Sequence, residues 1–559
     1  MPLSKYFTMF QRHETRPTPP QIYNARIYWS AIVASWVAVI IGYDAGFIGG
    51  AVALSSFKAE FGFNDMSASK QSTTSEQIIS LFHVGAFFGA LFTYPLAHYT
   101  GRKMSLLVAT LLLIVGSAIQ LASSTSIGLG PMYAGRVLTG VGIGAVSNVA
   151  PMYAAEIAPP SIRGQLIGFY EIAWQVGGVF GFWINYGTSV NIADTEAKQW
   201  QIPVAIQLVP PGILAMTLWS LPESPRWLLG VGRREKAIKN LCYLRKLDPD
   251  HEYIAYEMNI FEQEIIEKSE TVGTGLFDPF KTIITSKALT KRLALSSASF
   301  IIQNTVAVNA VNYYSPKIFQ TMGIDSVESS LLSTGVFGII KGVCCLIWSM
   351  CIVDRYGRRT SSIFGLVMCS LCFWYIGAYI KISDPASRIA SGDAQIDAGG
   401  KAALALFYIW TICYAFSWSG TPWVWNSEAF STTIRSATSS VNAASNWFWA
   451  FIMARFTAQM ITTMKYGIFF FFGACMTVAL PLYMYFYPET KNVPPEYIDE
   501  LFNHPAWKAH GIVMEKIAMD QSRANSVNLP LQDSDTNGKE SFALDELLVD
   551  DKKKPSQSV

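Results

Sequence analysis

Two oppositely charged residues stand inside long apolar stretches of this chain, where a charge is costly. Asp44 lies in the segment Gly42-Tyr43-Asp44-Ala45-Gly46, and Arg136 lies in a glycine-rich segment over 135–144. A carboxylate at that depth of an apolar span costs about 3 kcal/mol, so it is normally paired or functional. Glycine lets helices approach each other closely. We therefore predict that Asp44 and Arg136 form an ion pair, whose role is either functional or permanently structural.

Three short patterns occur once in each half of the chain. They are a Gly-Arg-basic turn, a Glu with an Arg seven residues later, and a Pro-Glu segment after a long apolar stretch. The copies are Gly101-Arg102-Lys103 with Asp354–Arg359, Glu156 and Arg163 with Glu428 and Arg435, and Pro222–Arg226 with Pro488–Lys491. Paired elements of this kind indicate a duplicated unit, which is how many secondary transporters are built.

The charged residues of these patterns would lie at the ends of apolar spans. We expect acidic side chains to hold the basic ones there, in ion pairs between helices of one bundle. Such pairs would hold the two halves together when a central cavity faces outward and break when it faces inward, which makes them a gate. The alternative is that they only fix topology and helix packing. The candidate gate residues are Arg102, Glu156, Arg163, Glu223, Asp354, Arg358, Arg359, Glu428, Arg435 and Glu489.

The composition is too apolar for an ordinary soluble enzyme of 559 residues, since 51% of the residues are hydrophobic and only 15% are charged. Windows of about 20 residues, the length that spans a bilayer, single out two sets of six apolar segments. These lie near 27–48, 76–97, 104–123, 131–153, 165–188, 201–221, 293–315, 329–353, 360–381, 401–425, 439–459 and 466–487. The predicted fold class is therefore an all-α integral membrane protein.

The distribution of charge and cysteine narrows the picture further. Lysine and arginine concentrate in one alternating set of loops, so the positive-inside rule places both termini and residues 222–292 in the cytoplasm. The formal net charge of +2 argues against a nucleic-acid partner. The eight cysteines show no metal-ligand spacing and no disulfide-permissive location, so we expect no metal and no cofactor. The polar first 26 residues show no cleavable signal peptide.

These features divide the chain into five parts. Residues 1–26 form a cytoplasmic segment, 27–221 and 293–487 form two six-helix bundles, and 222–292 form a cytoplasmic linker of short amphipathic helices. Residues 488–559 form a cytoplasmic tail. We expect this tail to be largely disordered beyond about residue 503, because it has too few apolar residues to pack.

Several motifs in combination resemble those of the sugar porter family of the major facilitator superfamily, and within it most those of fungal quinate permeases. The resemblance spans roughly residues 20–500. Its motifs are Gly135–Gly144, Pro151–Gly164, Pro222–Leu228, Gln303–Ser315, Asp354–Arg359, Gly420–Glu428, Asn446-Trp447 and Pro488–Lys491. The resemblance implies a major facilitator fold of twelve transmembrane helices in two six-helix bundles. It also implies proton-coupled uptake of a quinate-like hydroxy acid, or a related sugar or sugar acid, by alternating access at the plasma membrane.

The resemblance assigns roles to individual residues as well. Asp44 stands at a place where an Asp resembles the proton site of proton-coupled sugar porters. Its protonation would free Arg136. A substrate site at the midplane between the halves would offer hydrogen bonds in an otherwise apolar cavity. The implied substrate residues are Gln175, Gln303, Asn304, Asn309, Trp423 and Asn446. The alternative for any single amide is that it only joins helices.

Three positions depart from the pattern of the family that the chain resembles. His98 stands where an Asp is usual, which would leave the first-half copy of the gate one acidic partner short. Asn304 stands in place of a second Gln, and Ala450 stands in place of an Asn. An ordinary hexose pattern is thereby weakened.

Lys341 lies near the middle of the eighth apolar stretch, where an unpaired ammonium would be expensive. From there the side chain reaches either interface poorly. We therefore hypothesise that Lys341 belongs to the substrate site and pairs with an anionic substrate such as quinate or a uronate. The alternative is that it pairs with Glu171 or another buried acid for stability. His83, in the second stretch, is expected to be a packing residue.

The expected partners are thus a small-molecule substrate, a proton and the lipid bilayer. One alternative is a facilitative or proton-coupled transporter of hexoses or pentoses. Another is a non-transporting nutrient sensor of the same fold, although a sensor would be expected to have a longer tail and to lose gate residues. An enzyme is not indicated, because no nucleotide-binding loop, catalytic triad spacing or metal-ligand cluster is visible.

Overall fold

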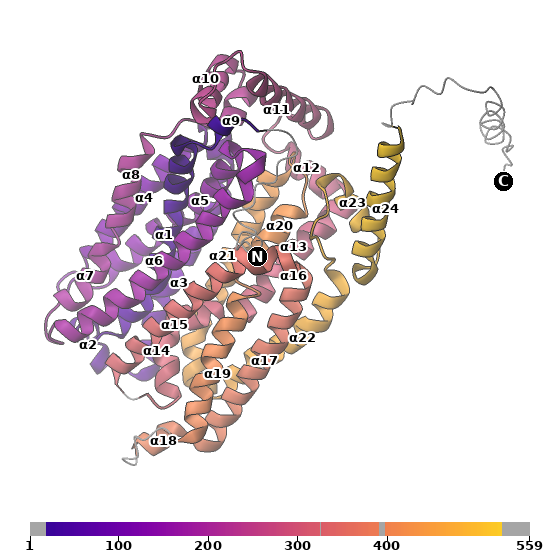
Figure 1. The fold of residues 1–559 in the computed structure, drawn as a ribbon. Helices are drawn as coiled ribbons and strands as arrows, with labels where there is room; N and C mark the ends of the chain where they lie inside the picture. Colours follow the sequence, from indigo (N-terminus) through magenta and orange to yellow (C-terminus); the bar gives the residue numbers. More distant parts are fainter. Residues whose placement is uncertain (1–17, 325, 391–396, 528–559) are drawn as a thin grey trace, which may run out of the picture. The chain divides into compact units, whose positions relative to one another are not determined.

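The computed structural model of the chain describes residues 18–324, 326–390 and 397–527. All regular elements in these ranges are helices. The described residues up to His510 form one compact unit, and the described residues from Gly511 to Val527 belong to a second. Within the first unit, the two halves of the chain lie side by side and are coloured purple and orange in Figure 1.

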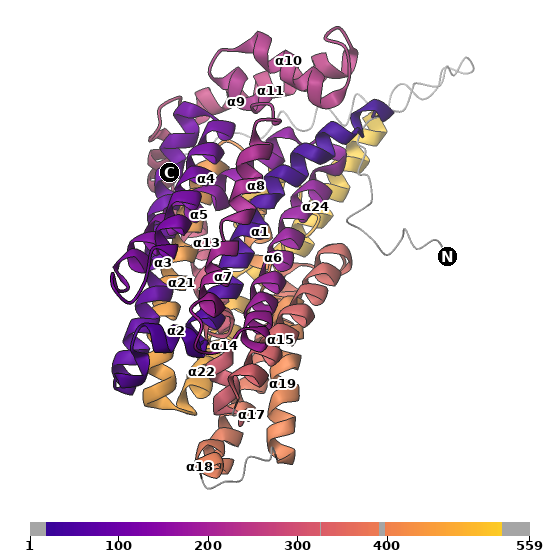
Figure 2. The ribbon, with the colours of Figure 1, turned by 90° about the vertical axis from the view of Figure 1, so that its left-hand side faces the viewer.

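The first half contains six membrane segments. They are α1 (Ala25–Ala53), α3 (Ala68–Thr100), α4 (Arg102–Leu121), α5 (Gly130–Ile157), α6 (Arg163–Asn191) and the pair α7 (Lys198–Ile206) and α8 (Val209–Leu218), with the short α2 (Ser55–Glu60) after α1. Asn24 starts α1 by accepting hydrogen bonds from the backbone N–H groups of Arg26 and Ile27. Figure 2 turns this half toward the viewer.

Four short helices connect the halves at one end of the bundle, which we call the linker end. They are α9 (Pro225–Gly230), α10 (Arg234–Arg245), α11 (Glu252–Thr271) and α12 (Asp278–Thr285), and the first three share a small apolar core. A buried ion pair of 2.8 Å joins Arg245 to Glu257. Arg245 also donates a hydrogen bond of 2.8 Å to the carbonyl oxygen of Ile157, which fixes the linker to the end of α5.

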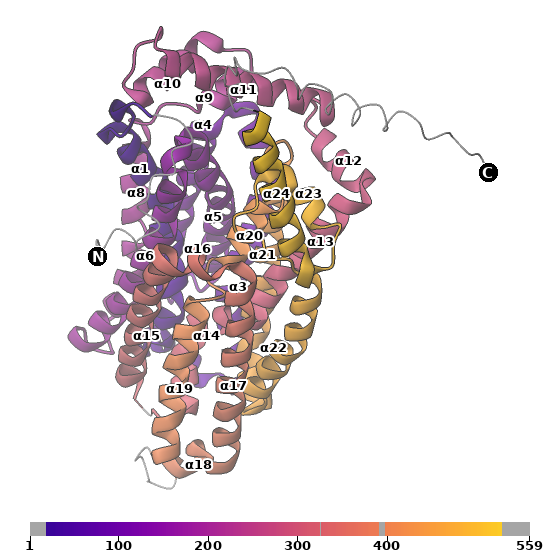
Figure 3. The same ribbon diagram turned by 45° about the vertical axis from the view of Figure 1, so that its right-hand side comes forward.

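The second half repeats the six segments. They are α13 (Lys287–Thr305) with α14 (Val308–Thr321), α15 (Val327–Ile347) continued by a π-helical turn over Trp348–Ile352 and by α16 (Val353–Tyr356), α17 (Arg358–Ser383), α19 (Ala398–Ala415) with α20 (Thr421–Glu428), α21 (Arg435–Met464) and α22 (Gly467–Phe486). The short α18 (Pro385–Ala390) follows α17 at the end opposite the linker, which we call the far end. Figure 3 brings α17, α19 and α22 forward.

Two membrane segments of the second half are interrupted. α13 ends at Thr305, and Ala307 takes a left-handed backbone conformation with φ of 76° before α14 begins. A second interruption separates α19, which ends at Ala415, from α20, which begins at Thr421. Irregular backbone at membrane depth is tolerated where it is buried in protein or lines a cavity. The interruptions therefore mark the interior of this half as the place to look for a site.

Ten helices or helix pairs of the described residues are long and apolar enough to cross a membrane. The two membrane segments outside this set are α6 and α21, the fifth segment of each half, which carry polar residues along their length. Both contact the opposite half, α6 through α15 and α21 through α3. These two helices therefore lie at the interface of the two halves, and together the segments form the twelve-helix arrangement that the sequence predicts.

The tail differs from its prediction. We expected disorder beyond about residue 503, but the structure has a helix, α24 (Ala506–Val527), after the short α23 (Ile498–Leu501). Ala509, Val513 and Ile517 recur every four residues and give α24 an apolar face. Such a face is hard to recognise because the segment as a whole is polar. Residues 528–559 lie outside the described residues.

Candidate functional site

Asp44 and Arg136 meet in the interior of the first half. Their ion pair joins Arg136 Nη1 to Asp44 Oδ1 at 2.7 Å, and neither side chain is exposed. Arg136 Nε donates to the carbonyl oxygen of Ile78 at 3.1 Å, and Gln207 Nε2 donates to the same Asp44 oxygen at 2.6 Å. No described residue forms a hydrogen bond with Asp44 Oδ2. One carboxylate oxygen thus receives both donors, while the other is available to a proton.

Glycines let the helices around this ion pair approach at backbone distance. A side chain at Gly140 or Gly144 would collide with the backbone of α3, and a side chain at Gly42 would collide with the carbonyl oxygen of Trp174 in α6. The glycine-rich segment of the sequence predicts this close approach. The sequence analysis does not identify Gln207 as a partner of Asp44. The available signal is that Gln207 is an amide inside the sixth apolar stretch.

Three of the predicted substrate residues form an amide cluster at the interruption between α13 and α14. Asn309 Nδ2 donates to Asn304 Oδ1 at 2.5 Å, and Asn304 Nδ2 donates to Asn446 Oδ1 at 3.3 Å. Asn446 comes from α21, so the cluster joins two helices of the second half. The ring of Trp423 does not join this cluster by a described hydrogen bond and instead packs against Phe300, with centroids 4.8 Å apart.

A second polar network, around Glu171 of α6, crosses between the halves. Glu171 Oε1 accepts hydrogen bonds from Gln175 Nε2 at 2.8 Å and from Ser419 Oγ at 3.0 Å. Gln303 Nε2 donates to the carbonyl oxygen of Ser419 at 3.0 Å and to that of Trp418 at 2.8 Å. The network therefore links Gln175 in the first half to Gln303 in the second. Sequence reasoning considers Glu171 only as a partner of Lys341, although its spacing of four from Gln175 places both on one helix face.

Lys341 of α15 is buried, and its Nζ donates to Asn312 Oδ1 at 3.2 Å. It forms no ion pair with Glu171 or with any other carboxylate of the described residues, so that alternative is not realised in this conformation. Lys341 and Gln175 line the same small cavity between the halves. His83 packs edge-on against Tyr313 with centroids 5.2 Å apart, which fits a packing role.

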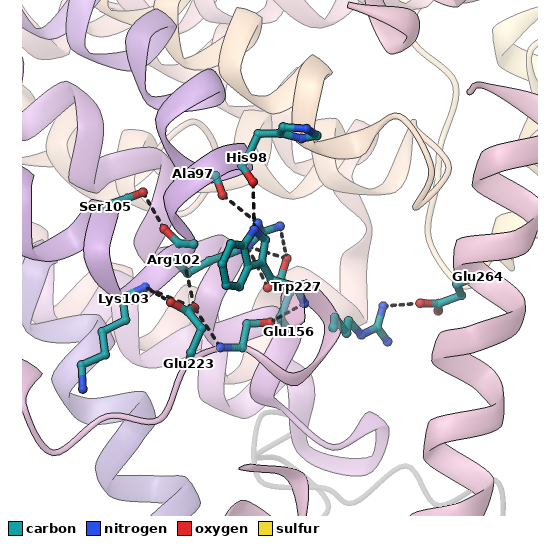
Figure 4. A network of polar contacts seen from close by, with 12 residues as sticks. Ala97, His98, Arg102, Lys103, Ser105, Glu156, Glu223, Trp227 and Glu264 are labelled. Atoms are coloured by element: carbon teal, nitrogen blue, oxygen red, sulfur yellow. Dashed lines mark hydrogen bonds and ion pairs between the residues drawn. The ribbon is translucent and has the colours of Figure 1, made fainter. Parts of the chain in front are cut away.

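At the linker end, the two copies of the predicted gate contain equivalent ion pairs. Arg102 contacts Glu156 at 2.7 Å in the first half, and Arg358 contacts Glu428 at 2.7 Å in the second. Figure 4 shows the first copy, in which Arg102 also donates to the carbonyl oxygen of Ala97 at 3.0 Å. Each pair joins the third membrane segment of its half to the fourth. In the first copy it joins α4 to α5, and in the second it joins α17 to α20.

The carboxylates of Glu223 and Glu489 cap the third membrane segment of each half. Glu223 accepts hydrogen bonds from the backbone N–H groups of Arg102 and Lys103, at 2.9 and 3.1 Å. Glu489 does the same for Arg358 and Arg359, both at 2.9 Å. A negative charge at a helix N-terminus also interacts favourably with the helix dipole. Burial nevertheless raises the pKa of the Glu223 carboxyl, against the effect of these donors.

The caps explain why each Gly-Arg turn contains glycine. Gly101 and Gly357 have φ values of 92° and 86°, in the region that side chains disfavour. A Cβ on either residue would also collide with the capping carboxylate, Glu223 or Glu489. The first and third of the duplicated sequence patterns are therefore two parts of one capping structure.

Arg163 and Arg435 differ from their prediction as ion-pair partners. Neither forms an ion pair with a described residue, although Arg163 lies within electrostatic range of Glu264 and Arg435. Arg435 donates to the carbonyl oxygen of Phe430 at 3.0 Å. The physical reason is that α5 ends at Ile157, so the seven-residue spacing from Glu to Arg crosses a helix boundary and does not fix how the side chains face.

The prediction for Arg359 also changes, whereas the one for Asp354 is not tested. The side chain of Arg359 donates to the carbonyl oxygens of Tyr487 and Met484, at 3.0 and 2.8 Å, and not to a carboxylate. The side chain of Asp354 lies outside the described residues. His98 takes part through its carbonyl oxygen, which accepts from Trp227 Nε1 at 3.0 Å.

The gate pairs at the linker end each join two helices of one half, as the sequence predicts, and their role in holding the halves together during transport stays a prediction. Among the ion pairs of the described residues, the one that joins the halves lies near the far end, between Glu76 of α3 and Arg455 of α21 at 2.6 Å. The backbone N–H of Gln459 also donates to Glu76. Lys317 of α14 donates to Ser72 of α3 at 3.3 Å. The far end is thus held together by polar contacts between the halves.

The capping carboxylates provide a first testable prediction. Glu489→Gln is expected to destabilise the protein by about 1–2 kcal/mol, because it removes a charged cap from two backbone N–H groups of α17. Glu223→Gln should have a similar effect on α4, and thermal unfolding of the detergent-solubilised protein measures both. Glu496→Gln, at an exposed position after the last membrane segment, is the matched control. Unfolding of the Glu489 variant at the temperature of this control would contradict the prediction.

The fold and the site together define a class of protein. Two six-helix halves with equivalent capped helices enclose polar networks at their interface, and this arrangement is that of a multi-pass membrane transporter with the major facilitator fold. Residues 30–502 match the family model described as sugar (and other) transporter. The chain therefore belongs to this sugar transporter family, as its motifs predict.

Curated relatives are similar along nearly the whole chain. The "Probable quinate permease" of Neosartorya fischeri is 46% identical over 511 residues, which cover 91% of this chain and 94% of the relative. The protein of the same name from Aspergillus terreus is 45% identical over 511 residues, with 91% of this chain and 93% of the relative covered. These relatives are permeases and not enzymes, which agrees with the prediction from the sequence.

Solved structures show the same fold. The partially occluded inward-open form of the xylose transporter XylE from E. coli matches with a TM-score of 0.69 and 21% identity, over 84% of this chain and 99% of that chain. A structure described as the proton:xylose symporter XylE bound to 6-bromo-6-deoxy-D-glucose matches with a TM-score of 0.69 and 23% identity, over 86% and 99%. The predicted twelve-helix major facilitator fold is thereby confirmed.

Proposed function

We propose that the protein takes up a quinate-like hydroxy acid, or a related sugar or sugar acid, together with a proton across the plasma membrane. The observation that carries this proposal is the buried ion pair of Asp44 and Arg136, in which a carboxylate oxygen without a described partner is available to a proton. A charge at this depth is normally paired or functional, and protonation would break the pair. The name of the relatives, which are 45% or 46% identical, supports the substrate class.

Helix α1 connects the proton site to the centre of the molecule. Asp44 contacts Arg136, while Gly42 and Gly46 of the same helical turn pack against the backbone of α6. α6 carries Gln175, which belongs to the network between the halves. Protonation of Asp44 would free Arg136, allow α1 to move against α6 and thereby change the central network.

The substrate would bind at the interface of the halves. The amide cluster of Asn304, Asn309 and Asn446 offers hydrogen bonds to hydroxyl groups, and Gln303 lies beside the interruption of the tenth segment. The half-exposed ring of Trp423 offers a flat surface to the C–H groups of a ring. Interrupted helices at the midplane are a common setting for such sites in transporters.

Alternating access would follow from the different contacts at the two ends. We place the linker end in the cytoplasm and the twelve helices in the lipid bilayer, because lysine and arginine concentrate in the loops of that end. The far-end ion pair of Glu76 and Arg455 then closes the outside in this conformation. Opening to the outside requires that this pair breaks, while the gate pairs within each half keep the helix ends of that half together.

Uptake of labelled solutes in a transporter-deficient host tests the proposal. The panel contains quinate, galacturonate, xylose and glucose at two external pH values, and we expect accumulation to be higher at the lower pH. Substrate-induced current separates the substrate classes, because a neutral sugar with one proton carries charge and a monoanion with one proton does not. Strong competition by glucose together with none by quinate would contradict the proposed substrate class.

A further inference from the structure

Lys341 places a buried positive charge at the interface of the two halves. The residue is 6% exposed, and an ammonium group has three hydrogens to donate. Its described acceptor is the neutral amide oxygen of Asn312, at 3.2 Å. Glu171 lies within electrostatic range of Lys341, but the two side chains form no ion pair. A buried charge that forms no direct ion pair is unfavourable, so an anion bound beside Lys341 would relieve that cost.

A small cavity between the two halves is lined in part by Lys341. Its walls come from α1 and α6 of the first half and from α14 and α15 of the second. Gln175, Asn312 and Lys341 supply the polar side chains of the lining, and Gly46, Gly178 and Gly338 also line it where neighbouring helices pack closely. The cavity thus combines one cation with two amides and an otherwise small, largely apolar lining. In this conformation the cavity has room for about one water molecule, so a ring carboxylate matches its chemistry but enters only when the halves separate here. Its charge would then meet Lys341, and its C–H surface would meet the apolar walls.

We propose that Lys341 binds the carboxylate of the transported substrate, an inference that rests on the proposed function and narrows it to polyhydroxylated monoanions. Lys341 forms the ion pair, and the amide N–H groups of Asn312 and Gln175 donate to the carboxylate oxygens. Charge-assisted hydrogen bonds of this kind are about twice as strong as neutral ones. The hydroxyl groups of the same substrate face the amides of the second half.

Glu171 is a nearby carboxylate whose hydrogen bonds are made elsewhere, and its charge limits how many negative charges the bound substrate can carry. The Oε1 atom of Glu171 already accepts from Gln175 and Ser419, which orients the carboxylate toward the second half. Because Gln175 lines the cavity and donates to Glu171, the negative charge of Glu171 lies beside the cavity and would repel a second negative charge on the substrate. The site therefore selects a monoanion over a dianion.

The cavity also shares a helical turn with the proton site. Gly42, Ala45 and Gly46 of α1 line the cavity beside Lys341, whereas Asp44 of the same turn contacts Arg136 on the other side. A substrate that enters the cavity would therefore contact the segment that carries Asp44. This arrangement links carboxylate binding directly to the ion pair that protonation would break.

The test compares acid and neutral probes in the full-length protein reconstituted into liposomes. The probes are quinate with quinate methyl ester, and galacturonate with galactose, and the measured quantity is the apparent affinity for each. Lys341→Met should weaken quinate and galacturonate by roughly 10- to 100-fold, as expected for the loss of a charge-assisted contact, and change the neutral probes less than about threefold. Lys341→Arg keeps the charge and should restore most of the preference for acids.

Lys317→Met is the matched control, because Lys317 is a second lysine of the same half that contacts Ser72 near the far end. It should leave the ratio of acid to neutral affinity unchanged. An equal change for acid and neutral probes in Lys341→Met, or full retention of the acid preference, would overturn the carboxylate site while the proposed function stands. If the unchanged protein transports none of the four probes at either pH, the proposed function fails first. Removal of a buried unpaired charge should not prevent folding, and thermal unfolding of Lys341→Met checks this.

Discussion

Asp44→Asn is expected to abolish proton-driven accumulation of substrate while leaving exchange of substrate across the membrane. Asn keeps the shape of the side chain and can still accept a hydrogen bond from Gln207, but it has no proton to gain or lose. One proton moving across 100 mV contributes about 2.3 kcal/mol, and one pH unit contributes about 1.4 kcal/mol. Together these support accumulation of several hundredfold for a neutral sugar, and the pH difference alone supports about tenfold for a monoanion.

Proteoliposomes with an imposed pH difference and an inside-negative potential measure this effect. In the Asn variant the accumulation ratio should fall to one for a neutral substrate and below one for an anion, because the potential then excludes the anion. Glu76→Gln is the matched control, since Glu76 is another buried carboxylate in an ion pair, with Arg455. This control can change the rate of transport but not the final ratio, which stoichiometry determines. Unchanged accumulation in Asp44→Asn would show that a group other than Asp44 carries the coupled proton, whereas an accumulation ratio of one for a neutral substrate in the unchanged protein would favour facilitated diffusion.

Arg136→Met is expected to have the largest effect on stability, about 3–5 kcal/mol, because it leaves a buried carboxylate without its counter-ion. Asp44 would keep only the hydrogen bond from Gln207, and the carbonyl oxygen of Ile78 would lose its donor. The double variant Asp44→Asn with Arg136→Met removes both charges and should recover most of the lost stability. Thermal unfolding of the detergent-solubilised single and double variants forms a double-mutant cycle that isolates the ion pair.

The outcome of this cycle also distinguishes a transport role from a purely structural one. If the double variant is stable, exchanges substrate and does not accumulate it, the pair is needed for coupling and not for the fold. If Arg136→Met unfolds at the same temperature as the unchanged protein, the ion pair does not contribute to the stability of the folded protein. Both results can be read from the protein without knowledge of its physiological substrate.

The sequence predicts much of the fold because membrane segments are long, apolar and evenly arranged. It also predicts the pair of Asp44 and Arg136, since few charged residues stand inside those segments and each needs a partner. The caps by Glu223 and Glu489 could not be predicted in the same way. Their partners are backbone N–H groups, which every residue except proline has, so no particular side chain in the sequence marks the contact.

The contacts between helices were the hardest to predict. Arg163 and Glu156 are close in the sequence, but a helix boundary separates them and their side chains have different surroundings. The far-end ion pair of Glu76 and Arg455 joins residues that are remote in the sequence. Its recognition requires the rotation of α3 relative to α21, which depends on packing along the whole interface and not on any local pattern.

The polarity of α6 and α21 has a consequence for how the chain enters the membrane during synthesis. Neither helix belongs to those that are apolar enough to cross a bilayer by length and composition. A polar helix is retained in lipid only when neighbours cover its polar groups. α6 can pack against α1, which is synthesised earlier, whereas the main neighbour of α21 is α3 of the other half. The insertion of the second half therefore depends on a first half that is already assembled, and damage to their interface would appear first as a failure of biogenesis.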